Sequence, residues 1–92
     1  MPGKSLEFEI ILSPKAMRQL KNLERETQLR IKNAVEKSLR PFPPRGDIAK
    51  LEGKPGVYRL RVGDWRVTFR YDFNRREVHV AEVAHRGRAY RG

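Results

Sequence analysis

The feature that most constrains the fold is the alternating stretch VYRLRVGDWRVTFRY at residues 57–71. A period of two between apolar and polar side chains is typical of β-strands that bury one face. Gly63-Asp64 interrupts the alternation and has the composition of a two-residue hairpin turn, which would pair Arg61 with Arg66. With this pairing one side of the hairpin carries only apolar residues: Tyr58, Leu60, Val62, Trp65, Val67, Phe69 and Tyr71. A slip of one residue would destroy that arrangement, so we expect this register.

The other side of the predicted hairpin, called the basic face below, carries Arg59, Arg61, Arg66, Thr68 and Arg70. Like charges placed directly opposite each other destabilise a sheet. A sheet selected for stability alone would intersperse glutamates among these arginines. We therefore interpret the basic face as a site for an anionic ligand that is held at several phosphates.

The N-terminal half predicts a strand followed by a helical hairpin. Residues 6–12 alternate as a strand does, and Ser13-Pro14 supplies an N-cap followed by a proline at the first helical position. Helical spacing of apolar residues then predicts one helix over residues 14–23 and a second that starts near residue 25 or 27 and ends at residue 39. We expect a tight turn near Glu24 between them.

The remaining segments complete a small sheet. Residues 40–46, RPFPPRG, are expected to form an irregular linker because their prolines lack a backbone donor and fix φ. Residues 72–75 are predicted to turn into a last strand over Glu77–Val83. In that strand Val78 and Val80 would join the apolar side beside Phe69 and Val67, and His79 and Ala81 would join the basic face.

Together these elements predict an α+β fold in the order β-α-α-β-β-β. The helical hairpin would pack on one face of a small, mainly antiparallel, twisted sheet and leave the other face open. All of residues 1–92 would form one domain with a thin core, because a chain of this length buries only about 60–65% of its unfolded surface.

The charge and the composition limit the classes of partner that this chain can bind. A net charge of +10 on 92 residues favours polyanionic partners, and arginine outnumbers lysine nine to two in residues 50–92. Arginine suits bidentate contacts with phosphate and stacking on bases. The absence of cysteine excludes disulfides and thiolate metal sites. No apolar run approaches the roughly 20 residues of a membrane span, and no secretion signal is seen, so we expect a cytoplasmic protein with no membrane partner.

After the last predicted strand the chain reads AHRGRAY. Taken with KLEGKPGVYRLRVGDWRVTFRY, this segment is similar to the signature of the RelE/ParE toxin superfamily. The resemblance covers essentially the whole chain and implies a toxin of a bacterial or archaeal type II toxin–antitoxin module. RelE-like members cleave mRNA in the ribosomal A site without a metal, whereas ParE-like members share the fold and poison DNA gyrase.

The resemblance also implies site residues. In RelE-like members two basic residues on the first C-terminal strand, an arginine on the next strand, and a closing arginine and tyrosine line the site. The matching positions here are Arg59, Arg61, Arg66, Arg86 and Tyr90. The chain departs from the pattern at Glu52, where a basic residue often stands, and in carrying arginines where some members carry lysines. Further basic residues that we expect to contact RNA are Lys50, Lys54, Arg70 and Arg88.

The sequence does not identify which residue would act as the general base in a metal-free cleavage. Such a reaction needs a base for the 2′-OH proton, an acid for the 5′-oxygen and cations for the developing charge. Arginine meets only the last need, because it stays protonated. The titratable candidates are His79, His85, Glu52 and Tyr90, of which His85 is favoured because it precedes Arg86. No residues with metal-ligand spacing and no Gly-rich phosphate loop are recognised in the sequence.

The sequence thus predicts a ribosome-dependent, metal-independent endoribonuclease that cleaves mRNA by 2′-OH attack and needs no cofactor. Its predicted partners are mRNA, a 70S-type ribosome and a cognate antitoxin that is acidic or carries an amphipathic segment. Two alternatives stay open: a ParE-like gyrase inhibitor without nuclease activity, and a catalytically degenerate toxin homologue.

Overall fold

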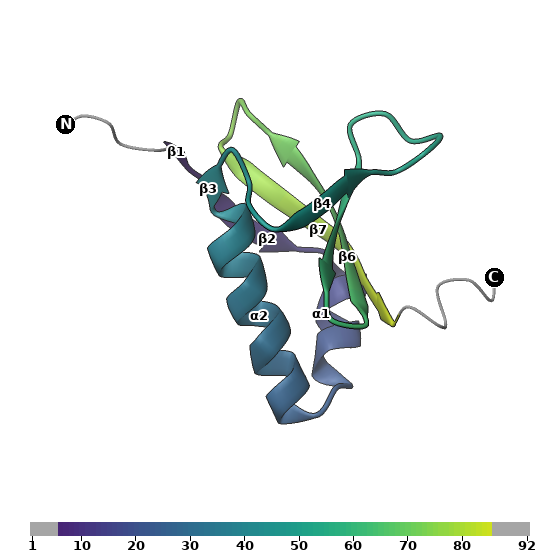
Figure 1. The fold of residues 1–92 in the computed structure, drawn as a ribbon. Helices are drawn as coiled ribbons and strands as arrows, with labels where there is room; N and C mark the ends of the chain where they lie inside the picture. Colours follow the sequence, from purple (N-terminus) through teal and green to yellow (C-terminus); the bar gives the residue numbers. More distant parts are fainter. Residues whose placement is uncertain (1–5, 86–92) are drawn as a thin grey trace.

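The computed structural model describes residues 6–85, in which two helices pack on one face of a five-stranded sheet (Figure 1). The elements are β1 (Leu6–Glu7), β2 (Glu9–Leu12), α1 (Pro14–Lys21), α2 (Arg25–Leu39), β3 (Pro41–Phe42), β4 (Asp47–Lys50), β5 (Tyr58–Val62), β6 (Trp65–Asp72) and β7 (Glu77–His85). The sheet has the order β2-β7-β6-β5-β4, with β2 parallel to β7 and every other pair antiparallel. The predicted α+β class with a mainly antiparallel sheet is confirmed.

The β5–β6 hairpin has the register that the sequence predicted. Val62 pairs with Trp65 and Arg61 with Arg66 across the turn, where Gly63 has a φ of 61°. Leu60, Val67 and Phe69 of this hairpin are almost completely buried. The alternation in the sequence therefore predicted the buried face of the β5–β6 hairpin correctly.

Two short strands were not expected. The segment Asp47–Lys50 forms β4 at the edge of the sheet, antiparallel to β5, so the sheet gains a fifth strand. Pro41–Phe42, predicted to be irregular, pairs with β1 as a two-stranded ribbon. The predicted first strand is divided at Phe8, because the chain leaves β3 there and goes on to pair with β7.

Strand β7 contains a bulge that the sequence analysis did not foresee. Thr68 faces Glu82, but the next residue, Phe69, faces Val80, so Ala81 is an extra residue in β7. Val78 and Val80 lie on the apolar side as predicted, but their partners differ from the predicted Phe69 and Val67. Val78 pairs with Tyr71 and Val80 with Phe69, while Val67 pairs with Val83. An extra residue inverts the alternation of every position that follows it.

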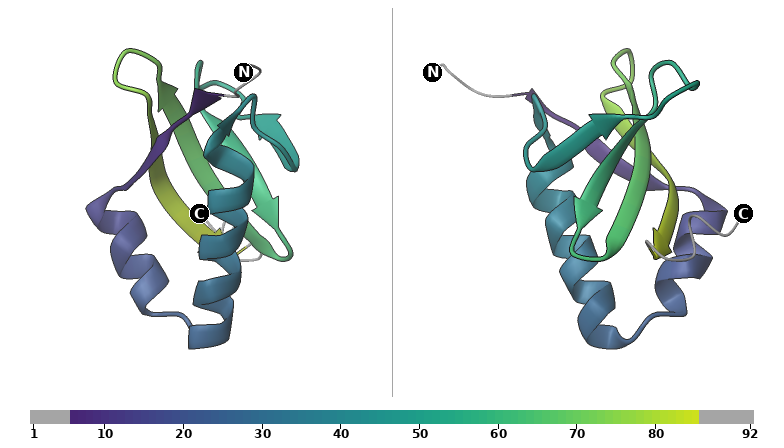
Figure 2. Two further views of the ribbon diagram at one scale, coloured as in Figure 1. Left: turned by 90° about the vertical axis from the view of Figure 1, so that its left-hand side faces the viewer. Right: turned by 45° about the vertical axis from the view of Figure 1, so that its right-hand side comes forward.

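The helices form a hairpin that covers only the apolar side of the sheet (Figure 2). The side chain of Ser13 accepts a hydrogen bond from the Ala16 backbone N–H, and Pro14 opens α1, as predicted. The core between helices and sheet consists of Phe8, Ala16, Leu20, Ile31, Val35, Leu39, Leu60, Val67, Phe69, Val78, Val80 and Val83. Within residues 6–85 no helix is long and apolar enough to cross a membrane.

Tyr71 ties the sheet to the end of α2. Its hydroxyl donates a hydrogen bond to the backbone oxygen of Leu39 at 3.2 Å, and burial raises the pKa of Tyr71 to about 12. The pKa of Tyr71 is therefore higher in the folded state than the value of about 10 in an unfolded chain. The stability that the neutral Tyr71 phenol contributes is complete below about pH 10 and is lost as the pH rises towards about 12.

We expect Tyr71→Phe to lower the free energy of unfolding by about 1 kcal/mol at neutral pH, the usual net value of one hydrogen bond. Between about pH 9 and about pH 11 the wild-type protein should lose more stability than the variant, because only the wild type holds this phenol neutral. Urea unfolding at both pH values measures the difference. Equal losses in the two proteins would show that Tyr71 is not the group responsible.

Candidate nucleic-acid interface

One face of the sheet carries no described helix (Figure 2). The strand register brings the predicted arginines together on this face in two neighbouring rows. Cα partners across four strands define the first row as Asp47, Arg61, Arg66 and Ala84. The second row consists of Ala49, Arg59, Thr68 and Glu82. Arg59, Arg61 and Arg66 thus form one cluster on β5 and β6, as the sequence predicted.

Asp47 on β4 contacts two of these arginines. Its Oδ1 lies 3.5 Å from Arg59 Nη1, and its Oδ2 lies 4.0 Å from Arg61 Nε. Arg59 Nη1 also donates to the backbone oxygen of Asp47 at 3.4 Å. The Arg59 side chain is only 19% exposed, so its stem lies along the sheet while its guanidinium meets the carboxylate. Asp47 therefore offsets part of the repulsion between the arginines and holds Arg59 and Arg61 in place.

The basic face is less uniform than the sequence suggested. Besides Asp47, Glu82 faces Thr68 in the second row, and Glu82 Oε2 lies 3.5 Å from Lys15 Nζ of α1. The acidic residues come from β4 and β7, the strands that flank the hairpin. The expectation that the sheet lacks interspersed carboxylates was therefore wrong, because the flanking strands supply them.

Beyond the bulge, Arg70 lies opposite His79. His79 Nε2 lies 2.9 Å from Glu77 Oε1, and Asp72 lies across from Glu77. Potential ligand atoms of Asp72, Glu77 and His79 all lie within 4.8 Å of one another, a grouping that could hold a metal ion. Spacing along the sequence did not reveal it, because the turn between β6 and β7 brings Asp72 to the other two residues.

Several residues predicted for the site lie elsewhere. His85 pairs with Trp65, which belongs to the apolar side, and the two rings meet edge to face at 5.0 Å. The bulge at Ala81 causes this, because unbroken alternation would have placed His85 on the basic face. Lys50 pairs with Tyr58 and so also lies on the side of the apolar residues. Lys54 is exposed in the loop between β4 and β5.

Three further predicted residues, Arg86, Arg88 and Tyr90, lie outside the described residues. Glu52, one candidate base, is exposed in the β4–β5 loop. The carboxylate that does contact the arginine cluster is Asp47, which the sequence analysis missed. Its position follows from the unforeseen strand β4, whose register places it beside Arg61.

Comparison with known proteins agrees with this architecture. A family model described as ParE toxin of type II toxin-antitoxin system, parDE, matches residues 10–90. A curated protein of Methanocaldococcus jannaschii, described as a candidate toxin RelE1, is 26% identical over 88 residues, which are 94% of this chain and 98% of the relative.

Solved structures share the fold. The toxin-antitoxin complex RelBE2 from Mycobacterium tuberculosis contains a chain that matches with a TM-score of 0.79 at 23% identity, over 90% of this chain and 95% of that chain. The RelB-RelE antitoxin-toxin complex from Methanococcus jannaschii contains one with a TM-score of 0.68 at 25% identity, over 87% of this chain and 94% of that chain.

Proposed function

We propose that this chain, which belongs to the ParE toxin family of type II toxin–antitoxin systems, is a toxin that cleaves mRNA on the ribosome without a metal ion. The observation that carries the proposal is the cluster of Arg59, Arg61 and Arg66 on the sheet face that carries no helix within residues 6–85, with the Asp47 carboxylate against two of them. Three guanidinium groups match the oxygens of one phosphate, and a carboxylate beside them can accept a proton.

The reaction follows from these groups. The ribose 2′-oxygen attacks the adjacent phosphorus and forms a new P–O bond, and its proton passes to Asp47. The guanidinium groups of Arg59, Arg61 and Arg66 stabilise the charge that develops on the phosphoryl oxygens. The bond from phosphorus to the 5′-oxygen breaks, and that oxygen takes up a proton from solvent water, while the proton on Asp47 returns to solvent. The products are a 2′,3′-cyclic phosphate and a 5′-hydroxyl.

Residues after position 85 complete the proposed site. Arg86 is assigned to the leaving 5′-oxygen and Tyr90 to stacking on a base, as the family resemblance implies. His85 is no longer assigned a proton-transfer role, because its ring lies against Trp65 on the opposite side of the sheet. Asp47 takes that role instead.

The proposed protein partner is a cognate antitoxin. Its support is that the similar solved structures are toxin–antitoxin complexes and that this chain carries a net charge of +10. An acidic or amphipathic antitoxin segment would associate quickly with such a surface. Met17 and Leu29 on the helical hairpin are each 49% exposed and offer apolar area for the same partner.

A second candidate function is inhibition of DNA gyrase without any chemistry. It is favoured by the family model, which is that of ParE toxins. It also fits the carboxylates on the basic face, because an interface with a protein needs charges of both signs. In this case the arginine cluster would bind acidic groups of the enzyme and not a scissile phosphate.

One experiment with two arms tests the proposal. In bacterial cells, expression of the chain alone should halt growth, and co-expression with its cognate antitoxin should relieve the arrest. In a purified system, programmed ribosomes should yield mRNA fragments ending in a 2′,3′-cyclic phosphate. Because ribosomes require Mg²⁺, metal independence is tested on a short RNA in excess EDTA at high protein concentration, where cleavage should be much slower than on the ribosome but should still occur.

The outcomes separate the two functions. Growth arrest with blocked gyrase supercoiling and no RNA fragments in either format would replace the nuclease by the gyrase inhibitor. Harmless expression of the folded chain would contradict both functions and leave a degenerate homologue.

A further inference from the structure

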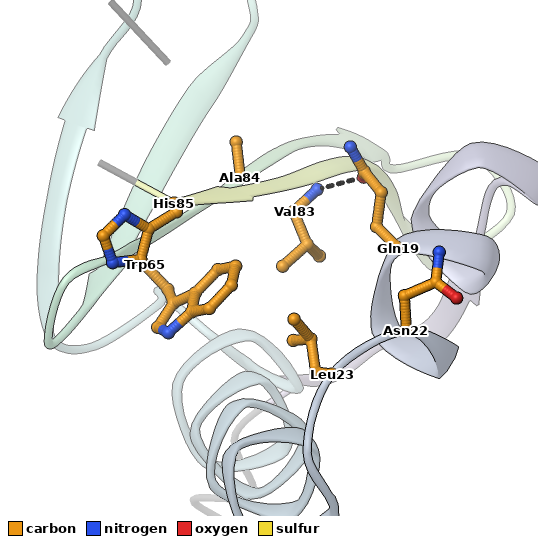
Figure 3. Close-up of a pocket in the computed structure, with 7 residues that line it drawn as sticks. All are labelled: Gln19, Asn22, Leu23, Trp65, Val83, Ala84 and His85. Carbon is orange, nitrogen blue, oxygen red and sulfur yellow. Dashed lines mark hydrogen bonds between the residues drawn. The ribbon is translucent and has the colours of Figure 1, made fainter. Parts of the chain in front are cut away.

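A hollow of about 630 Å³ lies where the end of α1 meets the start of β6 and the end of β7 (Figure 3). Its lining residues are Gln19, Asn22, Leu23, Trp65, Val83, Ala84 and His85. Figure 3 shows the two amide side chains on the helix side and the two rings on the opposite side, with Leu23 and Val83 between them. The hollow is separate from the arginine cluster, because Trp65 belongs to the apolar side of the sheet.

We propose that this hollow binds a single unstacked nucleobase of an RNA strand whose backbone lies on the basic face. The inference deepens the proposed function, on which it rests, by naming a base-recognition site. Unpaired bases are bound by stacking on aromatic rings and by hydrogen bonds to their edges, and this hollow offers both kinds of group.

The rings supply the stacking surface. Trp65 and His85 meet edge to face with centroids 5.0 Å apart, so the indole is held by a second ring. Trp65 is only partly buried and points into the hollow, towards Val83 (Figure 3). An apolar ring face beside Leu23 and Val83 suits the flat surface of a base and offers nothing to a phosphate alone.

The amides supply the hydrogen bonds. Gln19 Oε1 accepts a hydrogen bond of 2.7 Å from the Val83 backbone N–H, which fixes the side chain in place. Its amide nitrogen, and the whole amide of Asn22, have no hydrogen-bond partner within residues 6–85. An amide group can donate to and accept from the edge of a base at the same time.

The hollow adjoins the cationic surface. Ala84 lines it and is the cross-strand partner of Arg66 in the first row of the basic face. Arg30 of α2 adds a positive charge near the hairpin turn, because its Nη2 would lie 3.7 Å from a Cβ added at Gly63. Trp65 opens β6 and His85 ends β7, so both rings lie one residue beyond the Arg66–Ala84 pair, on the other side of the sheet. An RNA strand held by its phosphates at Arg66 has to turn around this end of the sheet for one of its bases to enter the hollow.

Trp65 makes the test direct, because it is the one tryptophan of the chain. Each of the four nucleoside 5′-monophosphates is titrated into the wild-type protein while the tryptophan fluorescence is recorded, with free N-acetyltryptophanamide as the control for absorption by the bases. At least one nucleotide should quench Trp65 saturably. Ribose 5-phosphate, which has the phosphate but no base, should not. No saturable quenching, or equal quenching by ribose 5-phosphate, would overturn the proposal.

Variants test the role of the amides. Asn22→Ala should weaken the binding of the best nucleotide about fivefold, the loss of one net hydrogen bond. Asn33→Ala, an exposed asparagine on α2 that does not line the hollow, is the matched control and should bind as the wild type does. Equal affinities of the two variants would refute recognition by the amides. Because mononucleotides cannot be cleaved, the result is independent of whether the chain is a nuclease.

Discussion

Arg61→Ala lowers the rate of RNA cleavage by about 10²- to 10³-fold, the loss seen when one preorganised charge-stabilising donor is removed from an active site. Arg61 lies at the centre of the first row, between Asp47 on one strand and Arg66 on the other. Its side chain is 45% exposed, so the guanidinium can reach a bound phosphate. Single-turnover cleavage of a short RNA in EDTA measures the rate.

The fold should survive this change. The Arg61–Asp47 contact is long, at 4.0 Å, and such exposed pairs contribute about 0–1 kcal/mol. Arg25→Ala is the matched control, because Arg25 is exposed at the start of α2 and away from the basic face. If the two variants cleave at the same rate, the arginine cluster is not the site of catalysis.

Asp47→Asn also lowers the rate, by about 10²-fold or more, because removal of a general base typically costs 10²- to 10⁴-fold. The amide keeps the size of the side chain but cannot take the 2′-OH proton. The variant should therefore cleave more slowly than the wild type even when all of the RNA is bound. The value of kcat at saturating RNA measures the effect.

A different result would assign Asp47 a structural role. If it serves only to position Arg59 and Arg61, then Asp47→Asn raises KM and costs little in kcat. The conservative variant Asp47→Glu separates the two cases further, because it restores a carboxylate without restoring the geometry of the contacts at 3.5 and 4.0 Å.

The hairpin and its arginine cluster could be predicted from the sequence because every position from Tyr58 to Tyr71 obeys one pattern. A period of two fixes both the strand and the face, so Arg59, Arg61 and Arg66 were grouped correctly. The helices were predicted well for a similar reason: the Ser13 cap and the apolar spacing agree.

Strand β4 and the position of Asp47 could not be predicted, because they depend on contacts between segments that no local sequence pattern encodes. Strand β4 has only four residues and follows a proline-rich segment, so nothing in its own sequence distinguishes it from a loop. Asp47 was missed with it. The bulge at Ala81 was missed although the sequence carries a sign of it: an unbroken alternation from Val78 and Val80 would place Glu82 on the apolar side and Val83 on the basic face.

The bulge in β7 has a consequence for comparing relatives of this protein. An alignment assumes that residues in the same column point in the same direction. In β7 that assumption depends on the number of residues between Val80 and Val83, because one extra residue exchanges inside for outside at every later position. Two relatives can therefore share a histidine after this strand and present it to opposite surfaces. Before a role is transferred to such a histidine, the residues in this interval have to be counted.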